Sequence, residues 1–595
     1  DLHSFPTRRS SDLAHWKRFI YVVIALFSLQ LTARAQETET FVHTIKQGET
    51  VYSIARTYQV SPESILKLNP TASTGIKAGG TLTIPQQQNG TQEKRFHTIQ
   101  AGETLYKLTK TYQVSADDIC KANPGLTAEN FKAGMVIRIP ASTMPVNIAP
   151  AKETAQPQGV AQSGCREMHK VKRKETLYSI AQNFNLTEAE LKAANPEMNE
   201  PGYKLRKGDF VCIPFPKPEK PKEVIPTNEE LMGKKTVSAP QKKISLGVIL
   251  PFKGGTPENE KMIEFYRGVL MAVENMKRSG TSVDIFAYDS GKSPGDIQAI
   301  VNNHPLNHLD FIIGPLYPEQ IAPLSKFCQH HHIKLVVPFS SLGDNVYENP
   351  YYYAINPPKS YQFAEAARLT TELFGKENVI FLEGTENDKD AAAFVDATRK
   401  RLQQNGSKAN HLRLNDDEIK WMEAMTQYKD NVIIPNSSSI KLLNQLFPKL
   451  KEFTKKNPEY RIKLVGYPEW QTYANNHLEN FYQFNTYAYS SFFRNPLNGN
   501  ADEFENAYQK AFHTPTLVSW PRFGMLGFDT AIYFLKGIST YGEAFDQHLS
   551  QIVTTTYQHR FDFQRISNWS GFINREIEFI HYSPSHSIEL IRLKK

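Results

Sequence analysis

The stretch HTIKQGETVYSIA at residues 43–55 returns as HTIQAGETLYKLT at 97–109 and as HKVKRKETLYSIA at 169–181. In each copy an Asn-Pro pair follows 19 residues after the shared threonine, at 69–70, 123–124 and 195–196. Each copy then ends in a short apolar run closed by proline, at 81–85, 136–140 and 210–214. The N-terminal part of the chain therefore contains three copies of one structural unit.

The pattern within one copy predicts a β-α-α-β unit. The first segment alternates polar and apolar residues and stops at a turn that needs positive φ, supplied by Gly48 and Gly102. A helix follows, with its apolar residues on one stripe, and a second helix begins at a capping serine or threonine. The Asn-Pro pair ends that helix, and the closing apolar run is the second strand. We therefore expect three small independent modules.

The repeated pattern resembles the LysM module, a βααβ carbohydrate-binding unit, over residues 43–85, 97–140 and 169–214. The resemblance implies that glycans containing N-acetylglucosamine lie in a shallow groove between the first turn and the loop before the last strand. In the third copy Lys174 replaces the turn glycine. The carbohydrate-binding residues carried over are Gly48, Glu49, Thr50, Val51, Tyr52, Asn69, Pro70 and Ile76 in the first copy, Gly102, Glu103, Thr104, Leu105, Tyr106, Asn123 and Pro124 in the second, and Glu175, Thr176, Leu177, Tyr178, Asn195 and Pro196 in the third.

A structural role competes with carbohydrate binding at many of these positions. The helical stripe is expected to form the core, and the repeated threonine is a typical helix cap. The repeated tyrosine sits one position off the apolar stripe. It either offers a ring face to a sugar or flanks the core, at residues 52, 106 and 178.

Residues before the repeats predict export. Residues 1–13 look like a translated sequencing adapter, so they are left out of the fold prediction. Residues 14–35 combine a basic start, an apolar stretch and an A-x-A cleavage site, which is typical of a secretory signal peptide and not of a membrane span. The net charge of +8 is spread along the chain without a basic helix, so it does not indicate nucleic-acid binding.

Export permits disulfides, and the chain has four cysteines. Cys165 and Cys212 lie in the two outer strands of the third module, which should be antiparallel neighbours, so we predict a disulfide between them. Cys120 and Cys328 lie in different domains and are expected to be free thiols.

The predicted domain boundaries follow from changes in composition. The modules take residues 42–86, 96–141 and 167–215, a polar linker takes 142–166, and a Pro/Lys-rich linker takes 216–243. We expect the second linker to hold the remaining domain away from the repeats. Residues 244–595 alternate strands and helices, which predicts a parallel, doubly wound α/β domain with two lobes.

This large domain resembles the type 1 periplasmic solute-binding proteins over about residues 244–545, on the strand-end motifs GVILPF at 247–252, FIIGPL at 311–316, VVPFSS at 336–341 and LGFDTA at 526–531. The resemblance implies a small ligand between the lobes that contacts Phe252, Tyr317, Ser340 and Ser341. Strand ends are where open α/β sheets bind ligands. A cleft used to dock another envelope protein is an equal alternative, and Ser340 and Ser341 are also typical turn caps.

No catalytic or metal-binding motif stands out in the sequence. A phosphate-loop-like ending at 290–293 lacks its first glycine, and the three histidines at 330–332 have no spaced carboxylate. We therefore expect no cofactor, no metal and no enzymatic activity.

The sequence predicts an exported, periplasmic protein that binds peptidoglycan through three LysM modules, similar in architecture to proteins of Bacteroidetes-type envelopes. Its receptor-like domain would bind a small ligand or an envelope protein. The alternatives are a cell-wall hydrolase with an unrecognised catalytic centre in the C-terminal domain, and an amino-acid-type solute receptor.

Overall fold

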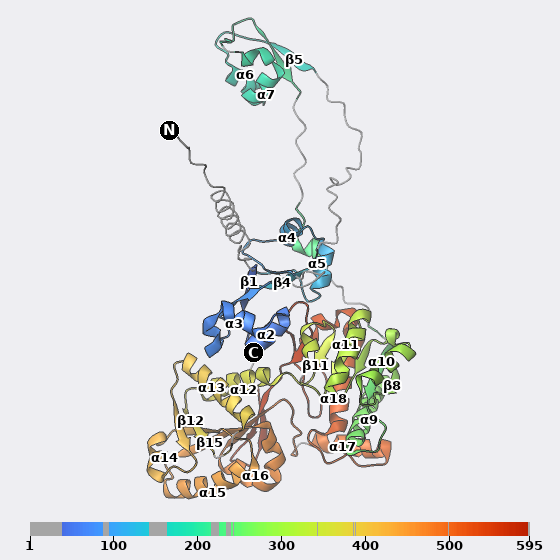
Figure 1. Ribbon diagram of the computed structural model, residues 1–595, viewed down its shortest axis with the longest axis vertical. Coiled ribbons are helices and arrows are strands. Elements are labelled where there is room, and N and C mark those ends of the chain that lie inside the picture. The colour runs from blue at the N-terminus through green and yellow to red at the C-terminus, as the bar shows by residue number, and fades with distance from the viewer. Residues whose placement is uncertain are drawn as a thin grey trace, which may run out of the picture. The chain divides into compact units, whose positions relative to one another are not determined.

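A computed structural model describes residues 39–86, 95–141, 164–200, 202–215, 225–233, 240–241, 243–341, 343–384, 386, 388–497 and 499–592. The adapter and signal peptide predicted for 1–35, and most of both linkers, lie outside these ranges. The chain divides into two compact units, one with residues up to 141 and from 228 onward, the other with the residues between them. Each unit is described by itself below (Figure 1).

All three repeats fold as β-α-α-β, as predicted, and the two strands of each pair are antiparallel. The first module consists of β1 (Thr40–Thr44), α2 (Val51–Tyr58), α3 (Pro62–Leu68) and β2 (Thr81–Pro85). The second consists of β3 (Arg95–Thr98), α4 (Leu105–Tyr112), α5 (Ala116–Ala122) and β4 (Val136–Ile139). The third consists of β5 (Cys165–Lys170), α6 (Leu177–Asn183), α7 (Glu188–Ala194) and β6 (Phe210–Pro214).

Each helix of a module begins at a side-chain cap. The repeated threonine accepts a hydrogen bond from the backbone N–H three residues on in every copy. The second helices start in the same way at Ser61, Ser115 and Thr187. Such caps satisfy backbone donors that the first helical turn leaves without partners.

A disulfide joins Cys165 and Cys212, the pair expected from the sequence. It ties β5 to β6 beside a small apolar core that includes Ile180, Leu191 and Val211. Cys120 and Cys328 are free thiols. The third module is thus a compact unit with its own core and its own covalent link.

The first lobe of the C-terminal domain is built on a mostly parallel sheet, as predicted. Its parallel strands are β7 (Lys243–Leu250), β8 (Ser282–Asp289), β9 (Phe311–Ile313), β10 (Lys334–Val337) and β11 (Tyr352–Ala354). Helices α9 (Pro257–Arg278), α10 (Pro294–Asn303), α11 (Pro318–His331) and α18 (Phe523–Tyr541) accompany this sheet (Figure 1). Gly268 lets α9 approach α18 closely, because a Cβ there would lie 1.9 Å from the Gly524 carbonyl oxygen.

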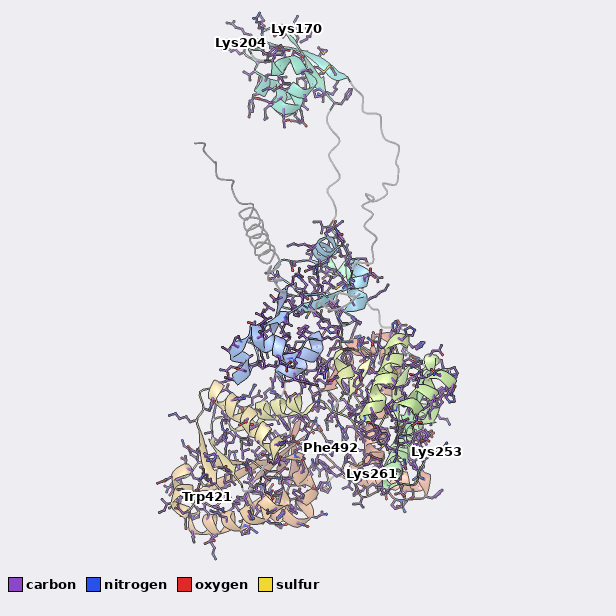
Figure 2. The ribbon with its side chains drawn as sticks, in the orientation of Figure 1. Lys170, Lys204, Lys253, Lys261, Trp421 and Phe492 are labelled. Atoms are coloured by element: carbon purple, nitrogen blue, oxygen red, sulfur yellow. A yellow bond between two sulfur atoms is a disulfide. The ribbon has the colours of Figure 1, made fainter. Side chains whose placement is uncertain are left out.

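The second lobe repeats the same plan. Its parallel strands are β12 (Asn378–Glu383), β13 (Ala409–Arg413), β14 (Asp430–Pro435), β15 (Arg461–Gly466) and β16 (Thr486–Ser490). Its helices are α12 (Lys359–Phe374), α13 (Lys389–Gln404), α14 (Glu418–Ala424), α15 (Ile440–Lys456) and α16 (Ala474–Gln483). Trp421 of α14 is fully buried in this lobe (Figure 2).

The last strands of the chain complete both sheets. They are β17 (Phe563–Arg565), β18 (Phe572–Asn574), β19 (Glu578–Tyr582) and β20 (Ile588–Ile591). The strand orders become β17-β18-β11-β10-β9-β7-β8 and β13-β12-β14-β15-β16-β19-β20, so the two lobes share the order of their five parallel strands. Each sheet is mixed because its added strands include antiparallel pairings.

The expectation that the second linker holds the C-terminal domain away from the repeats is wrong for the first two modules. The turn between β17 and β18 carries Trp569, which is 2% exposed and belongs to the apolar core of the first module. The Lys46 ammonium donates to the Ile566 carbonyl at 2.7 Å, and the Gly125 amide donates to the Asn568 carbonyl at 2.7 Å. The two modules and the C-terminal domain therefore form one unit.

A short helix from the predicted linker packs on the second module. This helix, α8 (Asn228–Met232), places Leu231 and Met232 against the module's apolar core. None of the helices in the described ranges is long and apolar enough to cross a membrane.

Removing the disulfide should destabilise the third module strongly. Replacing both Cys165 and Cys212 by serine in the isolated module should lower its free energy of unfolding by about 4 kcal/mol, because the bond closes a loop with a sequence separation of 47 residues. Urea unfolding followed by circular dichroism measures this. Reducing agent should shift the midpoint of the wild-type module and leave the double variant unchanged; an unshifted wild-type midpoint would contradict the prediction.

Candidate functional site

The first turn has the same backbone conformation in all three modules. Gly48 and Gly102 have φ values of 83° and 77°, as the sequence predicted. Lys174 takes the equivalent position in the third module with φ of 72°, although a side chain is disfavoured there. The loss of the glycine therefore leaves the turn geometry of the third module intact.

The repeated glutamate holds this turn from inside. The Glu49 carboxylate accepts from His43 Nε2 at 2.8 Å and from the Lys46 amide at 2.6 Å, and its side chain is 4% exposed. Glu103 and Glu175 make the same pair of bonds, with His97 and His169 at 2.7 and 2.9 Å. In each module one oxygen of this predicted carbohydrate-binding carboxylate is therefore hydrogen-bonded within the module itself.

A tyrosine completes the network in the first two modules. With Nε2 donating to Glu49, His43 Nδ1 accepts from the Tyr58 hydroxyl at 2.7 Å. The Tyr112 hydroxyl bonds His97 Nδ1 at 2.9 Å in the same way. In the third module Phe184 replaces the tyrosine, and its ring centroid lies 5.3 Å from that of His169.

These contacts shift the acidity of the glutamates. Burial raises the pKa of Glu49, but the hydrogen bonds from His43 and the Lys46 amide outweigh it and hold the pKa below its ordinary value. In the third module the Lys172 amide is the main cause that lowers the pKa of Glu175, followed by the His169 hydrogen bond. The carboxylates therefore favour the charged form, which binds the turn.

The asparagine before each proline joins the second helix to the last strand. Asn69 donates from Nδ2 to the Ile65 and Thr83 carbonyls and accepts from the Thr83 amide. Asn123 and Asn195 make the same three contacts in their modules. The structure thus places these predicted site residues in the frame of the fold.

The repeated tyrosines point outward. Tyr52 and Tyr178 are 52% and 62% exposed, and Tyr106 is half-buried. In the first module the Tyr52 hydroxyl accepts from Arg56, which also pairs with Asp344 of the C-terminal domain at 3.1 Å. The third module leaves its tyrosine ring open, and Lys170 and Lys204 project from the same module (Figure 2).

The groove of the first module has a second wall. Gly48, Glu49, Thr50, Val51 and Ile76 lie together along a cavity of about 520 Å³. Its other side is formed by α12 and α13 of the second lobe. Tyr52, Asn69 and Pro70, also predicted for this site, are not among its lining residues.

Helix α8 lies against the start of α4 in the second module. The Leu105 amide, at the start of α4, donates to the side-chain oxygen of Asn228 at 2.9 Å. Leu231 and Met232 pack beside it on the core. The three modules therefore share one turn but differ in what lies against it.

The predicted cleft residues of the C-terminal domain lie at the carboxyl ends of adjacent strands. Phe252 follows β7, Tyr317 follows β9, and Ser340 and Ser341 follow β10. Phe252 packs on Tyr266 with ring centroids 5.4 Å apart, and the Tyr317 hydroxyl donates to Glu258 at 2.8 Å. Ser340 is buried. Phe252 and Tyr317 therefore make their contacts within the first lobe.

Sequence reasoning missed the residues that the C-terminal domain brings to the modules, among them Asn228, Trp569 and those of α12 and α13. A tryptophan in the polar run SNWSG at 567–571 was the only signal of such a contact. In the described ranges no three His, Cys, Asp or Glu side chains are grouped as a metal ion would require.

Acid should loosen the modules through the repeated glutamate. Because the folded-state pKa of Glu175 is lowered, its stabilising effect is present above the ordinary glutamate pKa and is lost as the pH falls through the folded-state value. The melting temperature of the isolated third module should therefore fall as the pH drops below about 5. Glu175→Gln should remove much of this acid dependence, whereas Glu197→Gln, at an exposed carboxylate, should keep it. Equal pH profiles for both variants would refute the assignment.

Comparison with known proteins identifies the repeats. The family model described as LysM domain matches residues 43–85, 97–140 and 169–214. The chain is 31% identical over 113 residues to the endolysin of Bacillus phage B103, covering 18% of this chain and 41% of that protein. It is 24% identical over 203 residues to the N-acetylmuramoyl-L-alanine amidase sle1 of Staphylococcus aureus (strain USA300), covering 32% and 59%. The chain thus spans less than two thirds of the length of either relative.

The C-terminal domain is similar to an ABC transporter substrate-binding protein from Desulfitobacterium hafniense in complex with Leu, with 14% identity and a TM-score of 0.36 over 59% of this chain and 100% of that one. The two-lobed fold follows from the shared strand order of the two sheets. The chain carries three LysM domains, two of them packed on a two-lobed α/β domain.

Proposed function

We propose that this protein binds the N-acetylglucosamine-containing glycan strands of peptidoglycan through its LysM modules, without catalysing a reaction on them. The observation that carries this proposal is the first turn. It recurs in three modules with the same positive φ and the same internal glutamate contacts. The repeated glutamate, histidine and asparagine stabilise the fold of each module. The turn backbone and the side chains beside it would therefore be the groups that contact the sugar.

The modules do not contribute equally in this proposal. The third module is a compact unit of its own and exposes Tyr178 beside its turn. In the second module Asn228 already accepts from the Leu105 amide, and in the first module two helices of the second lobe face the groove. The third module is therefore the principal anchor to long glycan strands. A second engaged module would raise the overall affinity through its high local concentration.

We further propose that the protein is exported and acts in the periplasm, where its C-terminal domain serves a small ligand or an envelope protein. The domain's strand-end residues support a ligand role, since open α/β sheets bind ligands at that edge. Because Phe252 and Tyr317 are engaged with their own lobe, protein docking is an equal candidate.

A wall hydrolase is the rival from another class, since two relatives are named as an endolysin and an amidase. The amidase likeness falls on the LysM region, so it supports shared binding modules and not a shared active site. Zymography of the purified complete chain on peptidoglycan gels should give no clearing zone, with lysozyme as positive control. A clearing zone would refute the non-enzymatic assignment.

Glycan binding should depend on the open tyrosine of the third module. The isolated third module should sediment with insoluble peptidoglycan, and Tyr178→Ala should weaken its binding roughly fivefold, because an aromatic face contributes about 1 kcal/mol to stacking. Gln182→Ala is the matched control, because Gln182 is an exposed residue on the same helix. Sedimentation assays on both variants measure this. Failure of the wild-type module and of the complete chain to sediment would contradict the proposed function.

A further inference from the structure

The cavity between the first module and the second lobe has two unlike walls. One wall is the first turn of the module and the loop at residues 75–78. The other comes from α12 and α13, whose lining includes the small side chains Ala364, Ala367, Ala393 and Ala397. These alanines leave space where larger residues would close the gap. The volume of about 520 Å³ is in the range of small-molecule sites.

Specific contacts fix the two walls against each other. Gln47 Nε2 donates to the Ala364 carbonyl at 3.2 Å and to Glu365 at 3.3 Å, and Arg575 donates to the Gln47 carbonyl at 3.2 Å. Gly48 lies directly against α12, since a Cβ there would come within 2.7 Å of the Tyr361 ring. The cavity is thus bounded by an interface in which both partners make hydrogen bonds.

The charge around the cavity is positive. Lys77, Lys400 and Arg401 line it, and in the described part of the chain none of them has a carboxylate partner within 4 Å. The two lining carboxylates are engaged elsewhere, Glu49 with His43 and Asp396 with Arg399 at 3.0 Å. Arg401 Nε is buried and has no hydrogen-bond partner among the described residues. The cavity therefore offers the positive charges of Lys77, Lys400 and Arg401 to an anionic ligand.

We propose that this cavity is a composite site for a soluble glycan fragment that carries a carboxylate. The module's turn would bind the N-acetylated sugar, which rests on the proposed function, and Lys400 with Arg401 would bind the carboxylate. Peptidoglycan disaccharides with a free lactyl carboxylate have this chemistry. Guanidinium and ammonium groups form their strongest hydrogen bonds with such anions.

Helices α12 and α13 stand along one side of an open groove and limit the length of the ligand that fits there. A wall on each side of the groove admits a short fragment or a chain end and opposes a long strand that must lie across the module. The first module would therefore bind free glycan fragments, and the third module would bind the peptidoglycan polymer. The first and third modules would then bind ligands of different length but of the same chemical class.

The test compares a charged and a neutral disaccharide on the complete chain. Isothermal titration should show that Lys400→Glu weakens binding of the N-acetylglucosamine–N-acetylmuramic acid disaccharide by about tenfold, since a charge-assisted contact becomes repulsive. Binding of the neutral N-acetylglucosamine disaccharide should change by less than about twofold, because it offers no charge to Lys400. Lys389→Glu, an exposed lysine on the same helix, is the matched control and should leave both affinities unchanged.

A second variant makes the test independent of charge. Ala397→Trp should fill the cavity and weaken both disaccharides, while sedimentation with insoluble peptidoglycan persists through the third module. If Lys400→Glu and Ala397→Trp both bind the charged disaccharide like the wild type, the composite site is refuted while peptidoglycan binding stands. If the wild-type chain binds neither the fragments nor the polymer, the proposed function and the composite site both fall.

Discussion

The insertion of Trp569 into the first module is the contact on which the arrangement of the larger unit depends. Its ring lies 5.9 Å from Tyr58 and 5.2 Å from Phe96, and the Arg138 guanidinium lies over it at 5.0 Å. Tyr58 belongs to the first module, and Arg138 to the second. One side chain from the C-terminal domain thus joins the cores of two modules. Because aromatic residues bury large areas, this contact adds apolar burial to the packing of both modules.

This contact divides the three copies into two classes. The first and second modules share a hydrophobic core with the β17–β18 turn, so their position is set by the C-terminal domain. The third module keeps its core to itself and adds a disulfide where the others have tertiary contacts. Small domains that bury little apolar surface commonly need such a covalent link. The three copies of the module are therefore stabilised in two different ways.

Much of this structure could be predicted from the sequence because it is local. The module fold follows from turn glycines, capping residues and a helical stripe, and the lobes follow from apolar strands that alternate with helices. Positive φ at Lys174 and the inward glutamate could not be predicted, since a tertiary network overrides the local preference of the turn. The interface was also beyond prediction. Residues such as Ala364 or Asn228 are ordinary helix residues until another element approaches them, and no periodicity marks that approach.

The four strands that follow α18 carry a consequence for the order of folding. Strands β17 and β18 extend the first sheet, and β19 and β20 extend the second, although they come last along the chain. During synthesis, the first lobe lacks its full set of strands until Asn574 and the second until Ile591, long after the second lobe begins at Lys359. The first two modules are synthesised long before Trp569, so their shared aromatic core cannot be completed until this residue is made. A chain halted before this segment would expose two open sheet edges and an unfilled pocket between the modules, features that quality-control proteases and chaperones recognise as unfinished.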